Sequence, residues 1–94
     1  MGDNPLVELP YSIGNLRNIK WLFINNCKLT NLPESISNLQ SLTILNITGN
    51  SFSEFPEGIL KLKKLDKLRL NPEFSKKEIN LLKAELQNTR IFFE

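Results

Sequence analysis

Side chains that could carry covalent or acid–base chemistry are few in this sequence, and their spacing does not assemble a catalytic set. Histidine is absent, so the commonest general base and the commonest metal ligand are both missing. Cys27 is the only cysteine, and it cannot form an internal disulfide or bind zinc alone. The four glycines are scattered and form no phosphate-binding loop. We therefore expect no enzymatic activity, no metal site and no cofactor.

The charged side chains do not indicate a nucleic-acid partner. The net charge is +2, from 12 basic and 10 acidic residues, which is too balanced to indicate binding to a polyanion. Glu54 and Glu57 flank Pro56 and are interpreted as solvated. The lysines at positions 61, 63, 64, 76 and 77 are not interleaved with aromatic residues. We interpret these lysines as solvated too, with attraction to acidic partners as the alternative.

The sequence predicts no membrane span and shows no export signal. No apolar run reaches the length of about 18 residues that a membrane-spanning helix needs. The N-terminus lacks a basic segment followed by an apolar one, which a signal peptide would have. We expect a cytoplasmic protein if the chain is complete, and a secreted or surface protein if an N-terminal signal was removed.

Apolar residues recur at a fixed step of 23 residues along the chain. Each recurrence contains two apolar residues separated by one position, which is the spacing of side chains on one face of a β-strand. A constant step of this length is typical of a solenoid, in which each repeat stacks on the next. The pairs, in chain order, are Leu22 and Ile24, Leu45 and Ile47, Leu68 and Leu70, and Ile91 and Phe93.

A proline follows an apolar residue further along each repeat, as in Leu32-Pro33 and Phe55-Pro56. Proline suits the start of a short helical turn, because its ring fixes φ and its nitrogen has no hydrogen to donate. Apolar residues then recur at every third position, which fits a 3₁₀-like segment better than a regular α-helix. Each coil is therefore expected to contain one short strand, a turn and an irregular return.

The pattern Leu-x-x-Leu-x-Leu-x-x-Asn-x-Leu-x-x-Leu-Pro-x-x-Ile resembles the leucine-rich repeat in its 23-residue form, over nearly the whole chain. The resemblance implies an α/β solenoid, a short right-handed arc with parallel strands on its concave face and an irregular or 3₁₀ convex side. It also implies a ladder of hydrogen-bonded asparagines, which Asn4 and Asn50 match. Cys27 departs from asparagine in this column, and we interpret it as a buried ladder residue rather than a reactive thiol.

The repeat pattern ends after Leu70. Ser75 and Glu78 have the spacing of a capping box, and an amphipathic helix is expected to run from there to about Gln87. Residues 89–93 are rich in β-branched and aromatic types, which predicts a final strand. This helix and strand resemble the C-terminal cap of many bacterial leucine-rich-repeat proteins, which shields the last coil from water.

The whole chain, residues 1–94, is expected to form a single domain. Residues 1–8 would be the tail of a truncated N-terminal repeat, residues 9–70 the repeats, and residues 71–94 the C-terminal cap. No comparable cap is apparent at the N-terminus, so the strand around Leu22 and Ile24 is expected to have an open edge.

Strand alternation places the residues between the core pairs on the outer, concave face of the sheet. The predicted partner-binding residues are Trp21, Phe23, Ile44, Asn46, Lys67 and Arg69. The first three would form an apolar patch that anchors a partner, and the other three would orient it, with Arg90 extending the basic part. Tryptophan and arginine are among the types most enriched in binding hot spots, and exposed apolar clusters usually indicate contact.

Two functions fit these residues. The first is a non-enzymatic protein–protein interaction module that binds a polypeptide through the concave face. The alternative is a structural C-terminal fragment of a longer solenoid, which self-associates through its open N-terminal edge. In that case the apolar patch would contact a second copy of the chain in a homodimer. Otherwise it would be a surface that N-terminal coils, since lost, once covered. Both hypotheses make the partner a protein rather than a nucleic acid.

Overall fold

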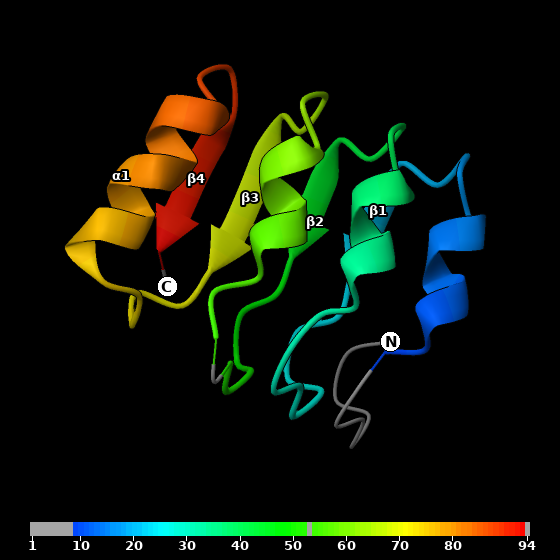
Figure 1. Ribbon diagram of the computed structural model, residues 1–94, viewed down its shortest axis with the longest axis horizontal. Helices are drawn as coiled ribbons and strands as arrows, with labels where there is room; N and C mark the ends of the chain where they lie inside the picture. Colours follow the sequence, from blue (N-terminus) through cyan, green and yellow to red (C-terminus); the bar gives the residue numbers. More distant parts are fainter. Residues whose placement is uncertain (1–8, 53, 94) are drawn as a thin grey trace.

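The computed structural model describes residues 9–52 and 54–93, which form a solenoid around one four-stranded sheet (Figure 1). The strands are β1 (Trp21–Phe23), β2 (Ile44–Asn46), β3 (Lys67–Leu70) and β4 (Arg90–Phe93). All neighbours are parallel, in the order β1-β2-β3-β4. Leu22 lies beside Leu45, which lies beside Leu68, so the register confirms the 23-residue step of the sequence.

A short 3₁₀ helix forms the return segment that precedes each of the strands β1, β2 and β3. These helices are η1 (Tyr11–Asn15), η2 (Glu34–Asn38) and η3 (Glu57–Lys61), and each follows directly after a proline. The N–H of the isoleucine three residues on donates to the proline C=O, over 3.0 Å in η1 and η2 and 3.2 Å in η3. This i to i+3 bonding is that of a 3₁₀ helix, which confirms the interpretation of the apolar spacing.

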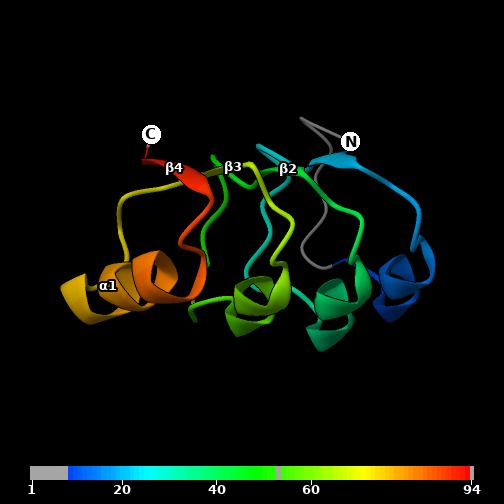
Figure 2. The ribbon, with the colours of Figure 1, turned by 90° about the horizontal axis from the view of Figure 1, so that it is seen from above.

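The hydrophobic core lies between the strands and the helices, which form two rows on opposite sides of the molecule (Figure 2). The row of helices spreads wider than the row of strands, so the sheet lines the concave side. Leu45 in β2, Ile47 directly after it, and the inward pair of β3, Leu68 and Leu70, are completely buried. The last pair, Ile91 and Phe93, packs against the core but remains half-buried, since no further coil covers it among the described residues.

The buried Asn50 side chain ties two neighbouring turns together. Its Oδ1 accepts hydrogen bonds from the N–H groups of Cys27 and Leu29, both over 3.0 Å. Its Nδ2 donates to the C=O groups of Ile24 and Ile47, over 2.9 and 3.0 Å. The implied asparagine ladder is therefore present at Asn50, and Cys27 is fully buried beside it. Asn4, the other expected member, lies outside the described residues.

The repeat ends where its turn can no longer form. Asn26 and Gly49 occupy the same column of successive turns, and both have positive φ, 57° and 74°. Proline cannot adopt a positive φ, and Pro72 stands at this column of the next turn. The chain therefore has to leave the repeat path after Asn71, which explains why the pattern breaks there.

Helix α1 (Lys76–Glu85) takes the place of the next 3₁₀ helix. Ser75 Oγ accepts from the N–H of Glu78 over 3.2 Å, and Glu78 Oε1 accepts from the N–H of Ser75 over 3.0 Å, which confirms the capping box. The helix ends at Glu85 rather than near Gln87, because Leu86 leaves the helical conformation and is buried in the core. The amphipathic pattern of the sequence did not predict that the chain leaves the helix at Leu86.

Replacing Ser75 by alanine should lower the free energy of unfolding by about 1 kcal/mol, because the N–H of Glu78 loses its acceptor. Urea denaturation followed by circular dichroism would measure the change. Ser51→Ala is a matched control at an exposed serine outside the helices, and we expect little effect there. Equal effects of the two substitutions would contradict the role of Ser75.

Candidate functional site

The concave face consists of the side chains of β1 to β4 that point away from the core. The register lines these side chains up in two rows that cross the sheet. The first row is Trp21, Ile44, Lys67 and Arg90, and the second is Phe23, Asn46, Arg69 and Phe92. All six residues predicted from the sequence therefore lie together on one surface, on three neighbouring strands.

Aromatic side chains dominate the β1 end of the concave face. Trp21 is 65% exposed and Phe23 is 47% exposed, which is high for side chains of this size. Ile44 is half-buried beside Trp21 and continues the apolar surface onto β2. A contiguous exposed patch of this kind is typical of a contact surface.

Cations dominate the other end of the concave face. The guanidinium of Arg69 lies 5.3 Å from the centre of the Phe92 ring, in a cation–π contact. Arg90 forms an ion pair with Asp66 over 2.9 Å, and both side chains are more than half exposed. A pair this exposed contributes only about 0–1 kcal/mol to stability.

Asn46 is partly engaged within its own turn. Its Oδ1 accepts from the N–H of Thr48 over 3.0 Å and from the Thr48 hydroxyl over 2.7 Å. These two bonds use the acceptor of the amide, so the side chain offers chiefly its NH₂ group on the concave face. The sequence placed Asn46 on this face but did not reveal that half of its hydrogen-bonding capacity is used internally.

The family of the chain follows from comparison with known proteins. A family model described as a leucine-rich repeat region matches residues 3–90. This chain belongs to the leucine-rich repeat family. A solved structure of a leucine-rich repeat protein from Leptospira interrogans is similar, with 33% sequence identity and a TM-score of 0.89. The match covers 99% of this chain and 24% of that protein, so this chain spans about a quarter of its length. No curated protein matches the sequence.

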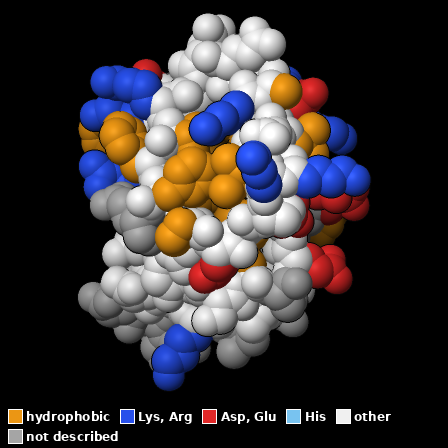
Figure 3. Space-filling view, turned by 90° about the vertical axis from the view of Figure 1, so that its left-hand side faces the viewer, with side chains coloured by type: hydrophobic (Ala, Val, Ile, Leu, Met, Phe, Trp, Pro, Cys, Tyr) orange, Lys and Arg blue, Asp and Glu red, His pale blue; other side chains and the backbone are white. Residues whose placement is uncertain are grey.

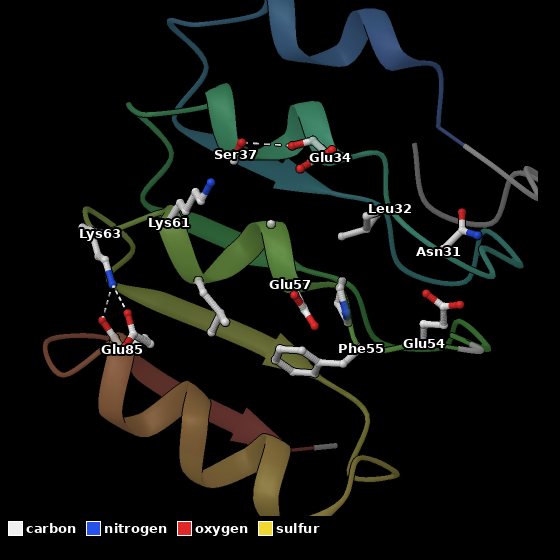
Figure 4. Close-up of a pocket in the computed structure, with 13 residues that line it drawn as sticks. Asn31, Leu32, Glu34, Ser37, Glu54, Phe55, Glu57, Lys61, Lys63 and Glu85 are labelled. Atoms are coloured by element: carbon white, nitrogen blue, oxygen red, sulfur yellow. Dashed lines mark hydrogen bonds and ion pairs between the residues drawn. The ribbon is translucent and has the colours of Figure 1, made fainter.

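Apart from the concave face, the leucine-rich repeat coils have a hollow on their convex side, between η2, η3 and α1 (Figure 4). It has a volume of about 600 Å³, and its apolar lining comes chiefly from Leu32, Phe55 and Leu60. Lys63 and Glu85 form an ion pair over 3.1 Å at one end. Leu60 stands in the column where earlier coils have Gly14 and Ser37, and the repeat pattern of the sequence did not predict this hollow.

Glu54 and Glu57 line this hollow and are exposed, in agreement with their interpretation as solvated side chains. No group of three or more cysteine, aspartate or glutamate side chains is placed to hold a metal ion within residues 9–52 and 54–93. Across the same described ranges, none of the helices has the length and apolar character required to cross a membrane.

Proposed function

We propose that this leucine-rich repeat chain is a non-enzymatic protein-interaction module that binds a polypeptide through its concave face. Proteins of this family generally bind proteins. The observation that favours the concave face is the exposure of Trp21 and Phe23 on strand β1, beside the half-buried Ile44. Burying such aromatic side chains supplies much of the free energy in most protein interfaces.

The two ends of the face would act differently on a partner. Trp21, Phe23 and Ile44 would anchor apolar side chains, and each large side chain buried contributes about 1.5–3 kcal/mol. Lys67 and Arg69 would orient the partner by charge and hydrogen bonding, which affects specificity and association rate more than affinity. Asn46 would add a donor from its NH₂ group.

A random-peptide display library tests this proposal. Peptides selected on the intact chain should bind the double variant Trp21→Ala, Arg69→Ala at least tenfold more weakly. Tyr11→Ala, Arg17→Ala is the matched control, since it removes an exposed aromatic and an exposed arginine at or next to η1, away from the strands. Because Trp21 is the only tryptophan, its fluorescence reports directly whether a peptide covers the concave face. Selected peptides that bind both double variants equally would refute the proposal.

The second candidate function is a structural role, in which the chain self-associates through the β1 end. Within residues 9–52 and 54–93, six large apolar side chains are exposed, and four of them lie close together in sequence, in η1, β1 and the segment between: Tyr11, Leu16, Trp21 and Phe23. β1 is also an edge of the sheet over the described residues. Light scattering separates the candidates: a dimer that resists dilution and is lost in Trp21→Ala favours self-association, and a monomer at all concentrations contradicts it.

A further inference from the structure

The backbone of β4 has hydrogen-bonding groups that point away from the sheet. Ile24 N–H donates to Asn46 O over 3.0 Å, and Ile47 N–H donates to Arg69 O over 2.9 Å. Each donor thus follows directly after β1 or β2 and bonds the next strand of the sheet. Phe93 occupies the same column in β4, in the same parallel register. Its N–H therefore points to where a fifth strand would lie, and no such strand exists among the described residues.

The side chains at this end are apolar and incompletely covered. Ile91 and Phe93 point into the core beside Leu68 and Leu70, which are completely buried, yet both remain half-buried themselves. Figure 3 shows hydrophobic side chains at the centre of this end of the molecule. Natural edge strands are usually blocked by an inward-pointing charge, a proline or a bulge. The inward positions of β4 carry none of these.

Positive charge borders this apolar centre on both sides (Figure 3). Lys76 and Lys83 are three and four residues from the half-buried Ile79, so they share its face of α1. Both lysines are exposed, and neither has a carboxylate partner among the described residues. Arg90 lies on the outward side of β4, where it is ion-paired with Asp66 but remains more than half exposed. A chain that adds to this edge would therefore lie between cations from the helix and from the strand.

We propose that the free edge of β4 binds an extended segment of a partner protein as an added strand, with apolar residues alternating with acidic ones. Strand addition takes affinity from main-chain hydrogen bonds and specificity from alternate side chains. The inward side chains of the segment would cover Ile91 and Phe93. The outward carboxylates would lie next to Arg90, and the lysines of α1 would attract the segment as it approaches.

The bordering cations favour an acidic partner over a second copy of this chain. Two copies joined through their β4 edges would bring Arg90 and the α1 lysines of both into the same region, and like charges placed opposite each other are destabilising. An acidic segment instead neutralises the α1 lysines and adds a second carboxylate beside Arg90, which already pairs with Asp66. This binding edge uses the main chain and the inward side chains of β4 and shares only Arg90 with the concave face, so it does not depend on the function proposed above.

The test is a titration of the ¹⁵N-labelled full chain with the peptide acetyl-Glu-Val-Glu-Val-Glu-Val-amide, followed by NMR. The amide signals of Ile91 and Phe93 should shift, and their hydrogen exchange should slow at least tenfold at saturation, while the amides of β1 stay unchanged. Two forms of the peptide, N-methylated at the valines or at the glutamates, serve as main-chain controls. At least one should bind tenfold more weakly, because methylation removes the donors that face β4.

Charge reversal tests the chemistry of the partner. The peptide acetyl-Lys-Val-Lys-Val-Lys-Val-amide should bind at least fivefold more weakly than the acidic peptide. Lys83→Glu should weaken binding of the acidic peptide at least threefold, and Lys64→Glu, at an exposed lysine outside α1 and β4, should not. The proposal would be overturned if both N-methylated peptides bound as tightly as the unmethylated peptide, if the basic peptide bound as tightly as the acidic one, or if the shifts were confined to β1. So would a dimer of the chain alone in which the amides of Ile91 and Phe93 are already protected.

Discussion

Asn50→Ala should lower the free energy of unfolding by about 3 kcal/mol or more, because the substitution leaves several buried backbone groups without a hydrogen-bond partner. The N–H groups of Cys27 and Leu29 lose their acceptor, and the C=O groups of Ile24 and Ile47 lose a donor. Each buried donor or acceptor left without a partner costs about 1–3 kcal/mol. Small domains have about 5–15 kcal/mol in total, so the variant should be only marginally folded.

Urea denaturation followed by circular dichroism would measure the loss. Asn18→Ala is the control, since this asparagine is exposed and lies between η1 and β1. We expect the control to change stability by no more than about 0.5 kcal/mol. If Asn50→Ala were as stable as Asn18→Ala, the hydrogen bonds of Asn50 would not be what holds the turns together.

Leu45→Ala should lower the free energy of unfolding by about 2–5 kcal/mol, the range observed when a buried leucine is truncated and leaves a cavity. Leu45 lies in the middle of β2, between Leu22 and Leu68, and is completely buried. The side chain therefore lies against the coils on both sides. These coils could fill the cavity left by the substitution only by moving their own strands.

Leu16→Ala provides the comparison, because this leucine is 48% exposed on the return side of the first described coil. Its truncation should lower the free energy of unfolding by well under half of the amount at Leu45. The midpoints of urea denaturation measure this difference, provided that the dependence of the free energy on urea concentration is the same in both variants. Similar losses at both positions would mean that Leu45 is not the centre of the shared core.

The repeat made the sheet predictable from the sequence. Because one step of 23 residues separates Leu22, Leu45, Leu68 and Ile91, any model that stacks the coils in parallel must place these residues side by side. The concave rows follow from the same step and the alternation of strand side chains. The proline columns likewise predicted where the 3₁₀ helices begin.

Features that depend on contacts outside these columns were not predictable in the same way. The contact of Arg69 with Phe92 joins two different residue types on adjacent strands, and nothing in a spacing pattern ranks it above other pairs. The internal bonds of Asn46 depend on the curl of the turn after β2. The early end of α1 is set by the space available to Leu86, which a single sequence does not reveal.

The uniform register has a consequence for how this architecture can change in size. The step from Leu22 to Leu45 equals the step from Leu45 to Leu68, and each coil meets its neighbours through equivalent positions. Inserting or deleting one 23-residue unit between β1 and β3 leaves every remaining column in phase and both ends intact. Gain or loss of whole units is therefore a route by which such a protein can evolve a longer or shorter binding surface without redesigning its core.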